Sequence, residues 1–261
     1  MRIALLQYPI EWADIEVNTN LAERRLSQVK GKADVAMLPE MFTTGFCTDN
    51  PRLAEEMSTS PTLARMQQWA SDFQLAVYAT VMIAENSNLY NRAFFVRPDG
   101  SFCYSDKRHL YAHGGEADFF TQGQQRVVAE YKGVRFLLLT CYDLRFPAWS
   151  RNTTGHDYDI ILYTANWPDV RIRYWDALLP ARVIENQCVV CGVNRVGDDA
   201  LGLHYNGHST VIDTRLNRLV KFADDEAATK IADIDVDEIR RFREHSPLWR
   251  DADRFEFIKD C

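Results

Sequence analysis

A thiol, a carboxylate and an amine each follow a short strand-like segment of this chain. Buried parallel strands read as continuous apolar runs, and open α/β sheets bind ligands at the carboxyl ends of such strands. We therefore expect the three side chains to meet at one edge of the fold. They are Cys141 after Phe136–Thr140, Glu40 after Val35–Leu38 and Lys107 after Ser101–Ser105.

These residue types around one carbonyl group would suit amide hydrolysis. Cys141 would attack the carbonyl carbon as a thiolate, because thiols are the most readily activated side-chain nucleophiles at neutral pH. Glu40 could take the thiol proton, pass it to leaving ammonia and then activate water. Lys107 and the backbone N–H of Tyr142 would stabilise the oxyanion, and the lysine charge would also favour the thiolate. The acyl group would pass through a thioester.

The elements that carry these side chains alternate between strands and helices. Apolar runs bounded by turn residues predict strands at Ile3–Gln7, Val35–Leu38, Ala76–Val81, Tyr90–Val96, Ser101–Ser105, Arg126–Tyr131, Val134–Thr140, Ile160–Ala165, Cys188–Asn194, Ser209–Ile212, Leu219–Phe222 and Lys230–Ile234. Amphipathic spacing and capping residues predict helices at Asn20–Val29, Pro61–Phe73, Ile172–Glu185 and Asp235–Glu244. Outer helices and tight hairpins together predict an α/β fold, a four-layer α-β-β-α sandwich with two mixed sheets.

Size and charge narrow the class of protein. A chain of 261 residues, 46% hydrophobic and 26% charged, can bury a large core, and no linker divides it, so we expect a single domain over residues 1–261. The net charge of −7 disfavours a nucleic-acid partner. No apolar run approaches the roughly 20 residues of a membrane-spanning helix. With no leader-like segment before the first strand, we expect a cytoplasmic protein without a membrane partner.

Three motifs resemble the signatures of the carbon–nitrogen hydrolase (nitrilase) superfamily, in the family's order. They are Leu38–Phe42, Asp106–Leu110 and Cys141–Pro147. The resemblance implies that the family's Glu-Lys-Cys triad falls on Glu40, Lys107 and Cys141, and that its second glutamate falls on Glu116. It implies no cofactor, and neither a nucleotide-phosphate glycine motif nor a metal cluster is present in the sequence.

Further segments are similar to the omega-amidase branch of this superfamily, among them Ala165–Pro168 and Ala181–Gln187. This similarity implies release of ammonia from the terminal amide of 2-oxoglutaramate or 2-oxosuccinamate. It also implies a homodimer, paired through Ile172–Glu185 and the segment after Cys141. The aromatic tail from Ser246 to Phe257 would pack across the subunit boundary or on its own domain.

A dicarboxylate monoamide needs a cation for its carboxylate, because a buried unpaired charge is unfavourable. Arg145 is the first candidate, with Arg171 and Arg173 next; the alternative for Arg145 is an ion pair with Asp143 or Glu185. Aromatic side chains could wall the pocket, or could simply pack in the core. They are Phe42, Phe119, Tyr142 and Trp167.

The same residues are compatible with other functions. An N-carbamoyl amino acid or a deaminated-peptide amide would use the same triad, and an inactive scaffold would keep only the fold. A papain-like hydrolase would use His109 or His113 as its base, although it would leave Glu40 unexplained.

Two further pairs have spacings typical of metal or redox sites. His204 and His208 have the i, i+4 spacing of metal ligands, but the residues between them predict a turn. Cys188 and Cys191 form a C-x-x-C pair inside a β-branched segment, where positions three apart point to opposite faces, so we interpret both as buried hydrophobic residues.

Overall fold

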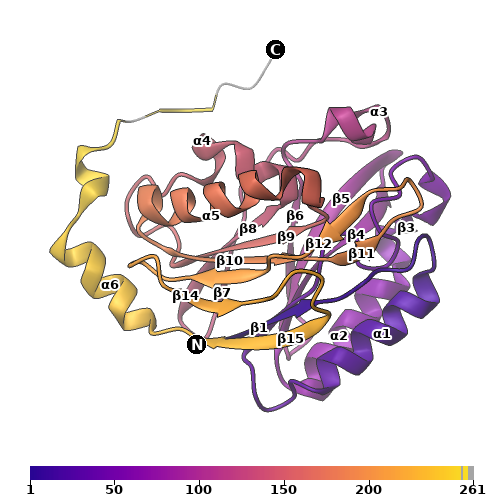
Figure 1. The fold of residues 1–261 in the computed structure, drawn as a ribbon, viewed down its shortest axis with the longest axis horizontal. Helices are drawn as coiled ribbons and strands as arrows, with labels where there is room; N and C mark the ends of the chain where they lie inside the picture. The colour runs from indigo at the N-terminus through magenta and orange to yellow at the C-terminus, as the bar shows by residue number, and fades with distance from the viewer. Residues whose placement is uncertain (254, 258–261) are drawn as a thin grey trace.

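Two mixed β-sheets pack face to face in the computed structural model, which describes residues 1–253 and 255–257 (Figure 1). The first sheet has the order β15 (Ala228–Asp233), β1 (Arg2–Gln7), β2 (Val35–Met37), β4 (Ala76–Glu85), β5 (Asn88–Val96) and β6 (Phe102–Asp106). A short strand, β3 (Glu55–Glu56), pairs with β4. The second sheet has the order β14 (Arg218–Lys221), β13 (Thr210–Ile212), β10 (Val189–Asn194), β9 (Ile160–Ala165), β8 (Val134–Thr140) and β7 (Val128–Tyr131). A separate hairpin pairs β11 (Val196–Asp198) with β12 (His204–Asn206).

Helices cover both outer faces of this pair of sheets. The α-helices are α1 (Ile15–Ser27), α2 (Pro61–Phe73), α3 (Glu116–Phe119), α4 (Pro147–Ser150), α5 (Ile172–Asn186) and α6 (Val236–His245). Apolar residues of α1 and α2 pack on the first sheet, and those of α4 and α5 pack on the second. In Figure 1, α5 lies on the side of the sheets opposite to α1 and α2, and α6 lies at one end. The order of layers is α-β-β-α, as predicted.

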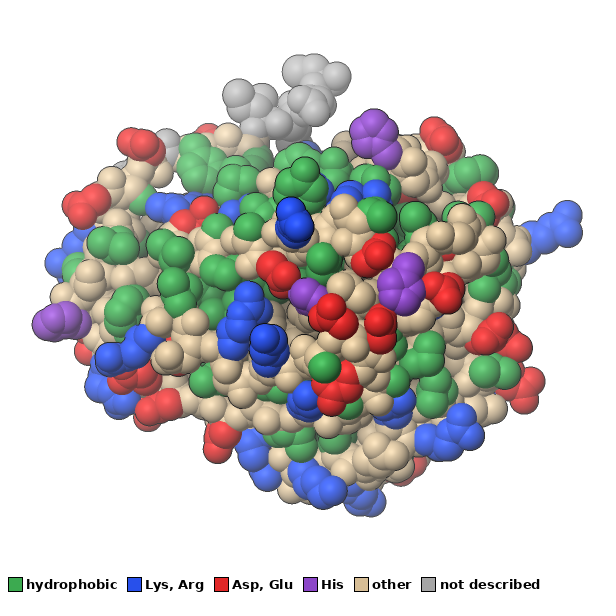
Figure 2. Space-filling view, in the orientation of Figure 1, with side chains coloured by type: hydrophobic (Ala, Val, Ile, Leu, Met, Phe, Trp, Pro, Cys, Tyr) green, Lys and Arg blue, Asp and Glu red, His purple; other side chains and the backbone are tan. Residues whose placement is uncertain are grey.

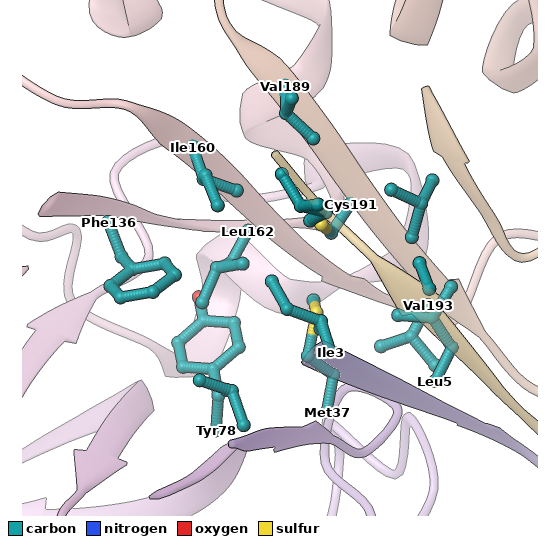
Figure 3. Close-up of a cluster of buried hydrophobic side chains, with 14 of the residues drawn as sticks. Ile3, Leu5, Met37, Tyr78, Phe136, Ile160, Leu162, Val189, Cys191 and Val193 are labelled. Atoms are coloured by element: carbon teal, nitrogen blue, oxygen red, sulfur yellow. The ribbon is translucent and has the colours of Figure 1, made fainter. Parts of the chain in front are cut away.

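The main core lies between the two sheets (Figure 3). Alternate residues of β1 and β4, such as Leu5 and Tyr78, point toward apolar residues of β8 and β9, such as Phe136 and Leu162. These side chains are completely buried. Cys191 belongs to this core, whereas Cys188 lies in the core beneath α5, so the prediction of opposite faces is confirmed.

Parallel strands at the centre of each sheet end at the same place in the molecule. In the first sheet β1, β2 and β4 are parallel, and in the second β8, β9 and β10 are parallel. Two hydrogen bonds cross between the sheets near these ends. The Thr164 hydroxyl donates to the Leu38 carbonyl (2.6 Å), and the Tyr78 hydroxyl donates to the Leu139 carbonyl (2.9 Å).

Several elements differ from the predictions, most clearly α1, β4 and the β11–β12 hairpin. Helix α1 begins at Ile15 rather than Asn20, because Asp14 caps it by accepting from the N–H of Val17. Strand β4 extends beyond Val81 because it pairs with β5 along its whole length. The β11–β12 hairpin was not predicted. Among the described residues, no helix is long and apolar enough to cross a membrane.

Candidate active site

The Cys141 thiol lies at the point where β8 ends. A short 3₁₀-helix begins at Cys141 itself and runs to Arg145, whereas the sequence indicated only the end of a strand. Cys141 adopts a φ of 44°, which is unusual for a residue with a side chain. The Asp143 carboxylate stabilises this turn by accepting from the Thr140 N–H (3.1 Å). Strain of this kind is concentrated at functional sites.

Lys107, which follows β6, lies between two buried carboxylates. Its ammonium Nζ is 2.9 Å from Glu40 Oε1 and 2.8 Å from Glu116 Oε2. All three side chains are shielded from solvent. Such a buried cluster is stable only when its charges are paired and hydrogen-bonded, and here the lysine donates to both acids.

Two asparagines that the sequence reasoning did not single out hold these acids. The Asn91 amide donates to Glu40 (2.8 Å) and to Glu116 (3.0 Å), and the Asn166 backbone N–H donates to the other oxygen of Glu40 (2.9 Å). Asn166 also contacts the nucleophile, since its carbonyl lies 3.9 Å from Cys141 Sγ. The local sequence gives Asn91 no distinct signal, because Asn88 and Arg92 are polar residues of the same strand.

Burial and neighbouring charges shift the pKa values of the groups in the site. Burial raises the pKa of Cys141 well above its ordinary value, and the Glu40 carboxylate adds to this effect more than Lys107 opposes it. Burial also raises the pKa of Glu116. Burial alone would lower the pKa of Lys107, but Glu116 and Glu40 raise it, so the lysine is cationic. Lys107 favours the thiolate, as expected, but burial and Glu40 outweigh it, so the resting nucleophile is a thiol.

A cavity of about 80 Å³ opens onto Cys141. It is lined by Phe46, Tyr111, Gly114, Cys141, Tyr142, Arg145, Asn166, Trp167, Pro168, Arg171, Asp199, Leu201, Leu203 and Tyr205. Two of the three proposed arginines are therefore at the cavity. A wider hollow of about 920 Å³ lies under the C-terminal tail and contains none of the candidate catalytic residues.

Arg145 is stacked among aromatic rings rather than paired with an acid. Its guanidinium carbon is 5.2 Å from the Trp167 ring centre and 4.6 Å from that of Tyr174. Within residues 1–253 and 255–257, no carboxylate forms an ion pair with Arg145. Asp143 instead pairs with His109 and Glu185 with Arg182, so the expected alternative partners are engaged elsewhere.

Three residues expected at the pocket lie elsewhere. Phe42 is buried against Trp69 in the outer core, because the chain turns after Glu40 and directs this ring toward α2. Arg173 is exposed on α5, two positions beyond Arg171, and helical rotation carries it away from the cavity. Phe119 is largely exposed on α3. The prediction that Phe42 and Arg173 line the pocket is therefore wrong.

The histidines of the papain-like alternative are not at the thiol. His109 stacks on Phe146, and its Nδ1 donates to the Asp143 carboxylate (2.8 Å), which fixes the ring, whereas His113 is exposed. Neither is among the residues that line the cavity. Over the described part of the chain, no three His, Cys, Asp or Glu side chains form a group that could hold a metal ion.

Comparison with known proteins decides the family. A family model described as carbon-nitrogen hydrolase matches residues 2–244. The chain belongs to the carbon–nitrogen hydrolase family. This confirms the resemblance seen in the three motifs, and with it the prediction of a hydrolase that acts on carbon–nitrogen bonds.

Relatives of this carbon–nitrogen hydrolase align over almost its whole length. Omega-amidase YafV of Escherichia coli (strain K12) is 41% identical over 256 residues, which is 98% of each chain. The 2-oxoglutaramate amidase of Bacillus subtilis (strain 168) is 31% identical over 252 residues, covering 95% of this chain and 96% of the relative.

Solved structures confirm the fold of this carbon–nitrogen hydrolase. XC1258 of Xanthomonas campestris, a CN-hydrolase superfamily protein with an arsenic adduct in its active site, has a TM-score of 0.95 at 35% identity, covering 98% of both chains. An amidase from Nesterenkonia sp. has a TM-score of 0.83 at 23% identity, covering 95% of this chain and 96% of that one, and shares the fold.

Proposed function

We propose that the protein is an omega-amidase that hydrolyses the terminal amide of 2-oxo dicarboxylate monoamides, 2-oxoglutaramate or 2-oxosuccinamate. The observation that carries the proposal is the placement of Cys141 at a cavity beside the Glu40–Lys107–Glu116 cluster. The names of the relatives support the choice of substrate, since two of them are called omega-amidase and 2-oxoglutaramate amidase.

In the proposed first half-reaction, Glu40 removes the proton of the Cys141 thiol as sulfur attacks the amide carbon. A base is needed because the thiol is protonated at rest. Negative charge moves to the amide oxygen, where the Lys107 ammonium and the Tyr142 backbone N–H stabilise it. The carbon–nitrogen bond then breaks, Glu40 returns the proton to nitrogen, and ammonia leaves an acyl thioester on Cys141.

In the second half-reaction, water replaces ammonia. Glu40 takes a proton from water as the water oxygen attacks the thioester carbon, the carbon–sulfur bond breaks, and Glu40 returns the proton to sulfur, which releases the 2-oxo acid and restores the thiol. Glu116 and Asn91 act as positioning residues, because they hold Lys107 and Glu40 in place. Arg145 binds the distant carboxylate of the substrate, while Tyr142, Trp167 and Arg171 complete the pocket.

We further propose a homodimer. Tyr174 and Ile184 are exposed apolar residues on the outer side of α5, and Val170 is exposed in the 3₁₀ turn that precedes this helix. Tyr174 also stacks on Arg145, so this face lies directly behind the cavity. The single-domain organisation and the cytoplasmic location stay predictions from the sequence.

Ammonia release from 2-oxoglutaramate, from an N-carbamoyl amino acid and from a peptide-derived amide tests the substrate class. We expect turnover of 2-oxoglutaramate and a loss of about a thousandfold or more in Cys141→Ala, Glu40→Gln and Lys107→Ala. Cys103→Ala is the matched control, since that thiol lies on β6 outside the cavity. Preference for another amide would reject the substrate, and full activity of Cys141→Ala would reject the mechanism.

A further inference from the structure

The β11–β12 hairpin forms one wall of the cavity that contains Cys141, through Asp199, Leu201, Leu203 and Tyr205. It belongs to neither large sheet. Backbone hydrogen bonds hold its two ends: the Val196 N–H donates to Tyr8 (3.3 Å), and the Asp225 N–H donates to Asn206 (3.1 Å). The position of the wall therefore depends on side-chain contacts between the hairpin and its surroundings.

His204, on β12, lies between two aspartates from different segments. Its Nδ1 is 2.7 Å from Asp198 on the facing strand, and its Nε2 is 2.8 Å from Asp225 in the turn between β14 and β15. Carboxylates only accept hydrogen bonds, and a neutral imidazole has a single N–H. Both contacts are hydrogen bonds only when the ring carries both protons and is a cation.

His208, just after β12, repeats this arrangement. Its Nδ1 is 2.9 Å from Asp176 on α5, and its Nε2 is 3.0 Å from Asp224 in the β14–β15 turn. The Asn206 amide lies 3.2 Å from the same Nε2. Its Oδ1 is buried and has no partner among the described residues. Exchanging the oxygen and nitrogen of this amide would satisfy Oδ1 only if Nε2 carries a proton.

We name this group the His–Asp clasp: His204, His208, Asp176, Asp198, Asp224 and Asp225. Figure 2 shows histidine side chains among acidic ones near the middle of one face. The clasp joins the hairpin to α5 and to the β14–β15 turn, and it places two imidazole rings among four carboxylates. Other charged groups on the surrounding elements are Asp169, Arg171, Arg173, Arg195, Asp199, Glu226 and Lys230, of which Glu226 and Lys230 pair with each other.

We propose that His204 and His208, as imidazolium ions, are positioning residues that hold the β11–β12 hairpin as a wall of the substrate cavity. The inference rests on the proposed function in one respect, that the amide binds in this cavity. Neither histidine lines the cavity, so their effect reaches the substrate through the hairpin.

The expected pH dependence follows from this geometry. The hydrogen bonds that His204 donates to Asp198 and Asp225 raise its pKa above the ordinary value of 6.5. A cation with a raised pKa contributes to stability fully below its unfolded pKa and loses that contribution as pH rises through the folded pKa. The two His204 contacts are therefore fully formed near pH 6.5 and below, and they weaken in more alkaline solution. Solvent and salt screen these partly exposed pairs, so the effect is modest.

The kinetic test compares the wild-type enzyme with the double variant His204→Gln/His208→Gln. We expect KM for 2-oxoglutaramate to rise about three- to tenfold at about pH 6.5, with kcat nearly unchanged, since several weak pairs are lost and the catalytic cluster is not. In the wild type, KM should rise with pH as His204 loses its proton, and this rise should be absent from the double variant. His245→Gln, an exposed histidine on α6, is the matched control and should behave as wild type.

A second measurement requires no substrate. Hydrogen exchange of residues 196–206, corrected for intrinsic rates, should be faster at about pH 8.5 than at about pH 6 in the wild type and equally fast at both in the double variant. If the protein does not hydrolyse 2-oxoglutaramate, the proposed function is rejected, but the exchange experiment still tests whether His204 and His208 hold the hairpin. Unchanged KM in a folded double variant, or exchange independent of pH in the wild type, overturns the inference.

Discussion

At the scale of single residues, the site combines groups that lie far apart in the sequence. Glu40, Lys107 and Cys141 could be found from the sequence because each follows a strand and each belongs to a motif. Asn91 and Asn166 were missed as ligands of Glu40, since local sequence does not reveal which distant carboxylate an amide will contact. Phe42 and Arg173 were misplaced for a related reason: the direction of a side chain depends on turns and helix rotation that the sequence defines only approximately.

The first prediction concerns the substrate carboxylate. Arg145→Ala should raise KM for 2-oxoglutaramate about 10- to 100-fold, because a charge-assisted hydrogen bond contributes about 1.5–3 kcal/mol. A neutral amide of similar length should be affected much less. Steady-state ammonia release measures both substrates.

Arg173→Ala is the matched control for this experiment, because Arg173 is exposed on α5 and does not line the cavity. It should keep the wild-type KM. If Arg145→Ala also keeps it and Arg171→Ala does not, the carboxylate is bound by Arg171 instead.

The second prediction concerns the thiol. Because burial and Glu40 raise the pKa of Cys141 above its ordinary value of 9.0, the thiolate fraction should grow about tenfold per pH unit up to pH 9. The rate of alkylation by iodoacetamide, followed by mass spectrometry of the Cys141 peptide, should therefore rise without a plateau over this range. Glu40→Gln removes a negative charge, so its curve should shift to lower pH. A plateau below about pH 8 in the wild type would contradict this account.

At the scale of elements, the apolar strands were the most predictable. The bounds of β8 and β9 agree with the prediction because both are continuous apolar runs buried on two faces. The β11–β12 hairpin was missed because Gly197, Asp198 and Asn206 are poor strand formers. Its strands are defined by contacts with the rest of the molecule rather than by their own residues.

The third prediction concerns α6, which is anchored by a buried arginine. Arg243 donates to the carbonyls of Gln187 (2.7 Å) and Tyr158 (2.8 Å) and lies 3.5 Å from Asp159. Burial lowers the pKa of Arg243, and removing such a group leaves its buried partners unpaired. Arg243→Met should lower the free energy of unfolding in urea by about 3 kcal/mol.

Arg241→Met provides the comparison on the same helix. Arg241 is exposed, and its ion pairs with Asp235 and Glu238 lie at the surface, so we expect a change of about 0.5 kcal/mol or less. Equal effects of the two substitutions would show that burial of Arg243 does not anchor α6.

At the scale of the whole molecule, the layered fold could be predicted and the position of the tail could not. Alternating strands and helices with hairpins indicate two mixed sheets, and the structure has them. The sequence allowed the tail to pack either across a subunit boundary or on its own domain. The structure places Trp249 against His156, 5.6 Å between ring centres, and close to Gly155, so this part of the tail packs on its own chain. Cys261 lies outside the described residues.

The fourth prediction tests the homodimer through the outer face of α5. Ile184→Asp should halve the molar mass measured by light scattering at micromolar concentration, because a carboxylate would be buried without a partner at the interface. Val17→Asp, which changes an equally exposed apolar residue on α1, should leave the mass unchanged. A wild-type protein with the mass of one chain would reject the dimer.

The division of the site between the two sheets has a consequence for its assembly. Glu40, Lys107 and Glu116 precede Cys141 in the chain, and the first sheet is completed only when β15, which follows Cys141, pairs with β1. The acids and the amine are carried by the first sheet and its loops, and the sulfur by the second, so the proposed site is complete only when the two sheets have packed together. We therefore expect a variant that weakens the packing between the sheets to separate the sulfur from the acids before either sheet unfolds.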